Sequence, residues 1–224
     1  GLDDDGDGLV DCDDPDCESS PDCAPEPETD CSNGLDDDGD GLVDCDDPDC
    51  ADSGYCDGLP VLFADFNGCE HAFTFAGDTF NGTSHPRYAS GECALNGGTG
   101  GSAGLHVALG NIDGRDITDG ISGGWSGEFS LSTASAVQVR LDCRLVTTGF
   151  DADECASVMA RVDNGPDEIL AERCGRGQDT GWQSKTFMRS LPAGAHTITI
   201  GGCNNKKTGA NEFGDIYIDN VEIR

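Results

Sequence analysis

The sequence predicts an all-β protein in which an irregular acidic segment precedes one β-sandwich domain. From Val61 onwards, short runs alternate between apolar and polar residues, and clusters of Gly, Asn, Asp and Ser separate them. Helical periodicity is nearly absent. Residues 1–56 hold 22 of the 44 acidic residues and none of the 12 Lys and Arg. We therefore expect two parts, residues 1–56 and residues 57–224, of which only the second can bury a core of useful size.

The acidic segment is a tandem repeat. The string GLDDDGDGLVDCDDPDC runs from Gly1 to Cys17 and recurs unchanged from Gly34 to Cys50, 33 residues further on. Each copy has the spacing D-x-D-x-D-G-x-x-D-x-x-D, in which alternate carboxylates converge on one ion, the Gly permits a sharp turn and the next residue offers a carbonyl oxygen. The predicted Ca²⁺ ligands are Asp3, Asp5, Asp7, Leu9, Asp11 and Asp14 in the first copy, and Asp36, Asp38, Asp40, Leu42, Asp44 and Asp47 in the second.

The loops differ from a helix-flanked EF-hand, because Pro15 and Pro48 directly follow the last Asp of each motif. The pattern resembles the thrombospondin type 3 calcium repeats and, more closely, the Cys-rich metal-binding repeats of bacterial surface proteins. This resemblance covers about residues 1–56 and implies Ca²⁺ as the cofactor. The alternative is a disordered acidic tail, which is common for such a composition. The regular spacing and the duplication argue against it.

Thirteen cysteines indicate an oxidising compartment, so we expect an extracellular protein, either secreted or at a cell surface. If the first cysteine of a copy bonds the second and the third bonds the fourth, the pairs are Cys31–Cys45, Cys50–Cys56 and Cys17–Cys23. Cys12 is then left over, because the first cysteine of copy one would fall before Gly1. It would bond an upstream segment or another chain. Other pairings remain open.

Ten runs in the second part are predicted strands, enough for two packed sheets. They are Val61–Phe66, Ala72–Phe75, Gly104–Leu109, Gly127–Leu131, Ala136–Leu145, Cys155–Asp163, Glu168–Cys174, Trp182–Arg189, His196–Ile200 and Asp215–Ile223. Asn164-Gly165 predicts a two-residue hairpin turn. Cys155 and Cys174 would lie opposite each other across that turn, and we expect them to be bonded. For the four cysteines that remain, we expect the pairs Cys69–Cys93 and Cys143–Cys203, and their other pairings stay open.

The strand order and the closing stretch, which ends in I-Y-I-D-N-V-E-I, resemble the jelly-roll sandwiches of carbohydrate-binding modules and bacterial adhesin domains. The resemblance covers residues 61–224 and implies a jelly-roll-type β-sandwich. In those families an acidic residue near the last strand often helps to bind a structural calcium, which here implies Asp219, together with Asp65 of the first strand. The alternative is that Asp219 is simply solvated on an alternating strand.

Several function classes are disfavoured. A net charge of −32 repels phosphate backbones, so we expect no nucleic-acid partner. No run approaches the ~18–20 apolar residues of a membrane helix. The chain contains no H-E-x-x-H zinc motif, and its four histidines are scattered singly. We therefore predict that it is not an enzyme.

Two functions remain. The first is a non-enzymatic, extracellular, calcium-binding structural protein, a subunit of a surface fibre or stalk that self-associates head-to-tail through its repeats into an open assembly. The alternative is a carbohydrate-binding, lectin-like module in which the repeats form a calcium-rigidified spacer. Its glycan would stack on Trp125 or Trp182. Asn81 begins the chain's lone N-x-[ST] triplet and is the predicted glycosylation site.

Overall fold

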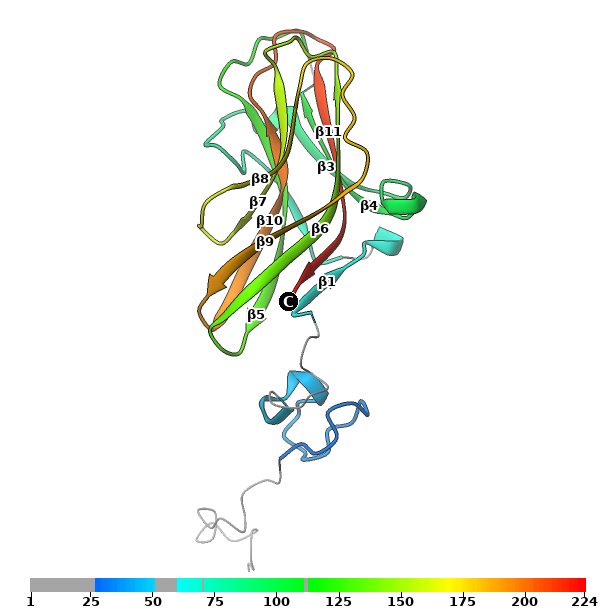
Figure 1. Ribbon diagram of the computed structural model, residues 1–224, viewed down its shortest axis with the longest axis vertical. Coiled ribbons are helices and arrows are strands. Elements are labelled where there is room, and N and C mark those ends of the chain that lie inside the picture. Colours follow the sequence, from blue (N-terminus) through cyan, green and yellow to red (C-terminus); the bar gives the residue numbers. More distant parts are fainter. Residues whose placement is uncertain (1–26, 51–59, 70, 111–112) are drawn as a thin grey trace, which may run out of the picture. The chain divides into compact units, whose positions relative to one another are not determined.

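The computed structural model describes residues 27–50, 60–69, 71–110 and 113–224. The chain divides into two compact units, residues 1–59 and residues 60–224 (Figure 1). In its described part, the first unit consists of turns and two short 3-10 helices, η4 (Asp44–Asp46) and η5 (Pro48–Cys50). It contains no strand within residues 27–50.

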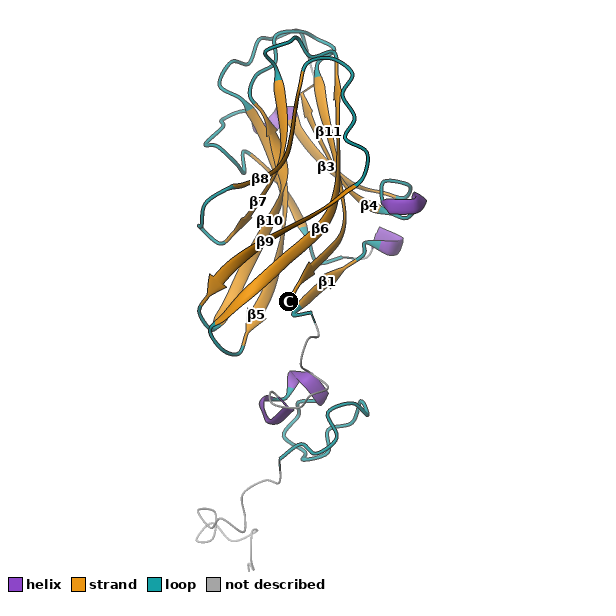
Figure 2. Ribbon diagram, in the orientation of Figure 1, coloured by secondary structure: helices purple, strands orange, loops and turns teal. Residues whose placement is uncertain are grey.

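The second unit is a sandwich of two antiparallel sheets (Figures 1 and 2). Sheet A has the order β3-β4-β11-β6-β9, with β1 paired to the end of β11, and sheet B has the order β2-β5-β10-β7-β8. The strands of sheet A are β1 (Leu62–Ala64), β3 (Ala89–Ala94), β4 (Gly104–Gly110), β6 (Ser135–Thr148), β9 (Gln183–Leu191) and β11 (Phe213–Ile223). Those of sheet B are β2 (Thr74–Gly77), β5 (Ile121–Leu131), β7 (Cys155–Val162), β8 (Glu168–Cys174) and β10 (Gly194–Asn204).

The strand order is that of a jelly roll. The eight consecutive strands from β4 to β11 divide equally, with β4, β6, β9 and β11 in sheet A and β5, β7, β8 and β10 in sheet B. The chain therefore crosses between the sheets after nearly every strand. This confirms the predicted all-β, jelly-roll-type sandwich.

Each predicted run overlaps a strand, but β3 and the first half of β5 were not predicted. The sequence of β3, A-S-G-E-C-A, has neither β-branched nor aromatic residues, and it is ordered by pairing with β4. In β5 the glycines hide the alternation. They are needed because a Cβ atom at Gly123 would lie 2.8 Å from the Phe75 ring.

The core lies between the inner faces of the two sheets. Along β6 every second residue from Val137 to Leu145 is buried, and all of these belong to one apolar cluster that also contains Ile198 and Ile200 of β10. Burying a large aliphatic side chain contributes about 1.5–3 kcal/mol. The sandwich is therefore held by its apolar core.

Two disulfides fasten the sandwich. Cys155 is bonded to Cys174, and the two residues are register partners across the β7–β8 hairpin, as the Asn164-Gly165 turn predicts. Cys69 is bonded to Cys93. The second bond ties the segment after β1 to β3.

The predicted Cys143–Cys203 bond was wrong, because both residues are free and buried. Cys143 belongs to the core between the sheets. In β10, Ile198 and Ile200 face that core, so alternation turns Cys203 to the opposite face of sheet B. There it packs in a separate cluster with Phe80 and Met159.

The predicted pairing in the second repeat was also wrong. Cys31 is bonded to Cys50, with Cα atoms 5.6 Å apart, rather than to Cys45. The N–H of Asp47 donates to the carbonyl of Asp44, and the N–H of Cys50 donates to that of Asp47. These two turns carry buried Cys50 back to Cys31, and the Cys31–Cys50 bond excludes the Cys50–Cys56 pair. Cys45 is itself disulfide-bonded. Cys12, Cys17, Cys23 and Cys56 lie outside the described residues.

Candidate functional site

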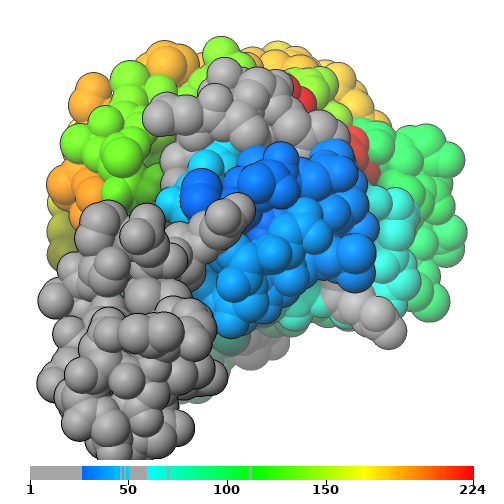
Figure 3. All heavy atoms as spheres, turned by 90° about the horizontal axis from the view of Figure 1, so that it is seen from below, coloured from blue at the N-terminus to red at the C-terminus, as the bar shows by residue number. Residues whose placement is uncertain are grey.

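The acidic loop of the second repeat is shaped by side chains that accept hydrogen bonds from its own backbone. Asp36 accepts from the N–H of Gly39 at 2.6 Å and from that of Gly41 at 3.0 Å. These glycines have φ angles of +81° and +96°, a region that other residues rarely adopt. In the space-filling view, the described residues of this unit form one continuous cluster of atoms, coloured blue (Figure 3).

Further turns of the same kind complete the loop. Asp38 accepts from the N–H of Asp40 at 3.0 Å, and Asp40 accepts from that of Leu42 at 2.8 Å. One oxygen from each of Asp36, Asp38 and Asp40 lies within 4.8 Å of the others. The structure thus brings together the first three predicted ligands of this copy.

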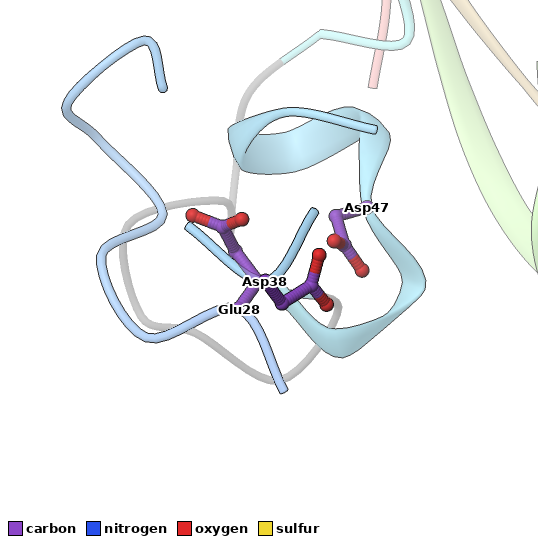
Figure 4. Close-up of side chains that lie close together, drawn as sticks. All are labelled: Glu28, Asp38 and Asp47. Atoms are coloured by element: carbon purple, nitrogen blue, oxygen red, sulfur yellow. The ribbon is translucent and has the colours of Figure 1, made fainter. Parts of the chain in front are cut away.

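A second acidic group shares Asp38 with the first. Its other members are Glu28, from the segment before Cys31, and Asp47, between η4 and η5 (Figure 4). Their ligand oxygens also lie within 4.8 Å of one another. Glu28 is only 5% exposed and Asp47 only 3%. Three separate stretches of the chain therefore bring carboxylates to one point.

One oxygen of each buried carboxylate has a partner, and the other has none. Glu28 Oε2 accepts from the N–H of Asp37 at 3.0 Å, and Asp47 Oδ1 accepts from the N–H of Asp49 at 2.7 Å. Glu28 Oε1 and Asp47 Oδ2 are buried without a hydrogen-bond partner. A buried anionic oxygen without a donor or a cation is strongly unfavourable.

The charged side chains around Glu28 and Asp38 are all carboxylates. The N–H of Asp37 favours the charged form of Glu28, but burial and the carboxylates of Asp37, Asp38 and Asp47 together raise the pKa of Glu28. The N–H of Asp40 acts likewise on Asp38, yet burial and the carboxylates of Asp40 and Asp47 raise its pKa. Residues 27–50 contain no Lys or Arg that would offset these charges.

This donor set fits a hard divalent cation. All available ligand atoms are oxygens, mostly from carboxylates, which is the chemistry that Ca²⁺ prefers. The two orphaned oxygens provide an independent sign of fit, because each belongs to a buried carboxylate of the second group and has no donor within the protein. Asp36, Asp38 and Asp40 would hold a cation in the first group, and Glu28, Asp38 and Asp47 would hold one in the second.

Not every predicted ligand lies in these groups. The carboxylate of Asp44 instead accepts the N–H groups of Asn33 and Gly34, at 3.0 Å each, and so fastens the start of the loop. Its φ of +50° belongs to the turn that begins η4. The carbonyl of Leu42 remains a predicted ligand. The first-copy ligands, Asp3, Asp5, Asp7, Leu9, Asp11 and Asp14, lie outside the described residues.

Sequence reasoning missed Glu28. It lies six residues before Gly34, outside the D-x-D-x-D-G motif, and such a motif carries no information about a ligand that precedes it. The available signal was weak: Glu28 is one of two acids close to the first cysteine of the copy, and Asp30, the other, is exposed. Burial distinguishes them, and burial was not visible in the sequence.

In the structure, Asp219 accepts hydrogen bonds from a neighbouring loop. Its Oδ2 accepts from the N–H and the hydroxyl of Thr99, both at 2.8 Å, and from the hydroxyl of Ser102. This carboxylate thus anchors the loop around η8 (Thr99–Gly101) to β11. Asp65 accepts from the N–H and the side-chain amide of Asn67. Neither acid belongs to the close acidic groups found in the described residues.

The prediction that a glycan stacks on Trp125 was wrong. This side chain is 7% exposed, belongs to the core cluster and donates its Nε1–H to the carbonyl of His106. It lies on the inner face of β5, so a sugar cannot stack on it. Trp182 precedes β9 and is half-buried.

A third acidic group lies in the loops of the sandwich and involves Asp151, Glu154 and Glu212. Its buried members are satisfied by the chain itself. Glu154 accepts from the N–H of Asp151 and the hydroxyl of Thr208, and Glu212 accepts from the N–H of Thr208. We assign no ion to this group.

The sandwich also has a pocket of about 260 Å³ on the outer face of sheet B. Ser157 and Met159 of β7, Glu172 of β8 and Cys203 of β10 line it. Ser157 donates its hydroxyl to Glu172 at 3.1 Å. Asn81, the predicted glycosylation site, lies in an exposed turn at the pocket and donates its Nδ2–H to the sulfur of Cys203 at 3.0 Å.

No protein-family model matches the chain, and no curated protein matches it. Solved structures resemble it at low identity. TmCBM61 in complex with β-1,4-galactotriose has 15% identity over 68% of this chain and 88% of that chain, with a TM-score of 0.37. The carbohydrate binding module CBM6cm-2 of Cellvibrio mixtus lichenase 5A, in complex with cellotriose, has 10% identity over 74% and 98%, with a TM-score of 0.34.

A third match is the CBM22-1–GH10 part of the Clostridium thermocellum endo-1,4-β-D-xylanase 10B, complexed with xylohexaose. It has 12% identity over 75% of this chain and only 28% of the xylanase chain, with a TM-score of 0.40. The jelly-roll assignment does not depend on these matches, since it follows from the strand order. Among the described residues, no helix has the length and apolar character needed to cross a membrane.

Proposed function

We propose that this chain is an extracellular calcium-binding structural protein, in which bound ions hold the acidic repeats in a fixed conformation. The observation that carries the proposal is the convergence of Glu28, Asp38 and Asp47, with two buried carboxylate oxygens that lack any partner. Disulfides such as Cys31–Cys50 support an oxidising, extracellular location.

The physical need for the ion follows from the charge. Residues 27–50 contain ten acidic residues and no base, so their carboxylates repel one another. No apolar core of the kind found in the sandwich opposes this repulsion among the described residues of the unit. Divalent cations would neutralise the carboxylates and crosslink the loop.

Calorimetric titration of the full chain with calcium tests the proposal. The wild type should take up calcium saturably at millimolar concentrations or below, and replacing Asp36→Asn and Asp40→Asn together should remove this uptake at the loop. Asp30→Asn is the matched control, because Asp30 is an exposed acid of the same unit outside both groups. Absence of saturable uptake by the wild type would contradict the assignment.

Assembly into a fibre or stalk is part of the same proposal. One feature of the sandwich supports it. Among the described strands, β2 pairs only with Gly123–Ser126 of β5 and leaves Gly127–Leu131 of that edge without a strand partner. An exposed edge can accept an extended segment of a neighbouring copy. Electron microscopy of native material should reveal filaments in calcium that dissociate on chelation, whereas single particles in both conditions would contradict assembly.

Carbohydrate binding is the second candidate, and the pocket on sheet B favours it. Its volume of about 260 Å³ lies just below the ~300–1,000 Å³ of pockets for drug-sized ligands, which suits a single sugar ring. The lining combines hydroxyl, amide and carboxylate groups with the apolar side chains of Met159 and Ile169.

A glycan array tests this second function. Binding by the wild type should be lost in Glu172→Gln and Ser157→Ala, which alter the pocket. It should be retained in Glu128→Gln, which changes an exposed carboxylate of β5 outside the pocket. Equal binding by all variants, or none by the wild type, would remove the pocket as a glycan site.

A further inference from the structure

We propose that Glu28 is a direct ligand of the calcium ion, and that the ion thereby fastens the segment connecting the two repeat copies onto the loop of the second copy. This inference rests on the proposed function, because it concerns the same ion. It deepens that function by assigning Glu28, which lies outside the D-x-D-x-D-G motif, direct coordination and the ordering of the segment before Cys31.

The carboxylate of Glu28 is already oriented as a ligand would be. The N–H of Asp37 donates to Oε2 at 3.0 Å, which orients the carboxylate and leaves Oε1 free. A ligand oxygen of Glu28 lies within 4.8 Å of those of Asp38 and Asp47. Calcium–oxygen distances are ~2.3–2.6 Å, so two ligands of one ion are at most about 5 Å apart. The spacing of the three oxygens satisfies this limit.

No positively charged side chain of the described loop explains the group. Oε1 of Glu28 and Oδ2 of Asp47 have no hydrogen-bond partner. No lysine or arginine lies within residues 27–50 to supply a positive charge. A cation coordinated by the three carboxylates would supply the missing positive charge.

Glu28 also makes the main contact between residues 27–30 and the loop residues 36–47. Among residues 27–30 it is the only buried side chain, since Pro27, Thr29 and Asp30 are exposed. The bond from the Asp37 N–H is the only hydrogen bond described between these four residues and the loop residues 36–47. In the sequence this segment lies between Cys23 of the first copy and Cys31 of the second. An ion held by Glu28 would therefore control how firmly the connection is ordered.

Hydrogen exchange of the full chain, with and without calcium, tests this inference. The variant Glu28→Gln keeps the size of the side chain and its acceptor for the Asp37 N–H, but removes the charge. In the wild type, calcium should slow amide exchange both in residues 27–30 and at Gly39 and Gly41 of the loop. In Glu28→Gln the slowing at residues 27–30 should be lost and the calcium affinity should fall at least about tenfold, while the loop amides still respond.

Controls separate this inference from the proposed function. Asp30→Asn, in the same segment, should behave like the wild type. Glu28→Asp, which keeps the charge on a shorter side chain, should restore part of the slowing. If Glu28→Gln matches the wild type in both readouts, Glu28 is not a ligand although the loop binds calcium. If calcium changes neither region in the wild type, the proposed function fails as well.

Discussion

On the outer face of sheet A, His106 of β4 contacts side chains of both neighbouring strands, β3 and β11. Its ring stacks on Tyr217 of β11 with centroids 4.7 Å apart, and its Nε2 lies 2.8 Å from Asp215. Its Nδ1 lies 3.4 Å from Glu92 of β3. Burial alone would lower the pKa of His106, but the hydrogen bonds and charges of Asp215 and Glu92 outweigh it and raise the pKa. Arg144 of β6, which lies over Tyr217, completes the group.

This shift predicts a pH dependence of stability. Because the pKa of His106 is higher in the folded state than its ordinary value near 6.5, its contribution is fully present below that pH and is lost as pH rises through the folded value. We expect His106→Gln to reduce the free energy of unfolding by about 1 kcal/mol at pH 5.5 and by less at pH 9. Urea unfolding at both pH values measures the difference. An equal loss at both would show that only packing is involved.

At the scale of one element, β10 is central to sheet B because it pairs with both β5 and β7. Two consecutive glycines, Gly201 and Gly202, allow its neighbours to approach closely. A Cβ atom at Gly202 would lie 2.1 Å from the carbonyl oxygen of Ser157 and 2.3 Å from Cδ1 of Ile216. The sheet and the core beneath it therefore leave no room for a methyl group.

Substitution of this glycine is expected to be costly. Gly202→Ala should destabilise the sandwich by about 3 kcal/mol, because strand backbone and core must both shift. The matched control is Gly114→Ala, where the nearest atom to an added Cβ, that of Ala210, is 3.9 Å away. It should change stability by less than about 0.5 kcal/mol. Urea unfolding of both variants checks this, and similar values for the two would contradict the packing argument.

The elements differ in how far the sequence predicts them. The Asn164-Gly165 turn sets the β7–β8 register locally, so the Cys155–Cys174 bond could be derived from it. The strand β3 could not be predicted from the sequence, because its small and polar residues become a strand only through pairing with β4. The Cys143–Cys203 prediction was wrong because pairing by elimination does not consider which face of a sheet each residue occupies.

At the scale of the whole molecule, the two units are stabilised by different kinds of interaction. The sandwich relies on a continuous apolar core, which alternation in the sequence predicts well. Residues 27–50 rely on turns and disulfides and, in our proposal, on ions. Motif spacing predicted Asp36, Asp38 and Asp40 correctly as a group. It missed Glu28 and gave no sign that Asp44 accepts hydrogen bonds at the start of the loop, because chain folding outside the motif determines which acids are buried together.

The most direct test of calcium binding by the repeats is a crystal structure grown in calcium and measured at a long wavelength, where calcium scatters anomalously. We predict an anomalous peak ~2.3–2.6 Å from carboxylate oxygens of Asp38 and its neighbours in the acidic loop. A peak that also contacts Glu28 would support the further inference. Well-ordered carboxylates with no peak between them, in millimolar calcium, would contradict the proposed function.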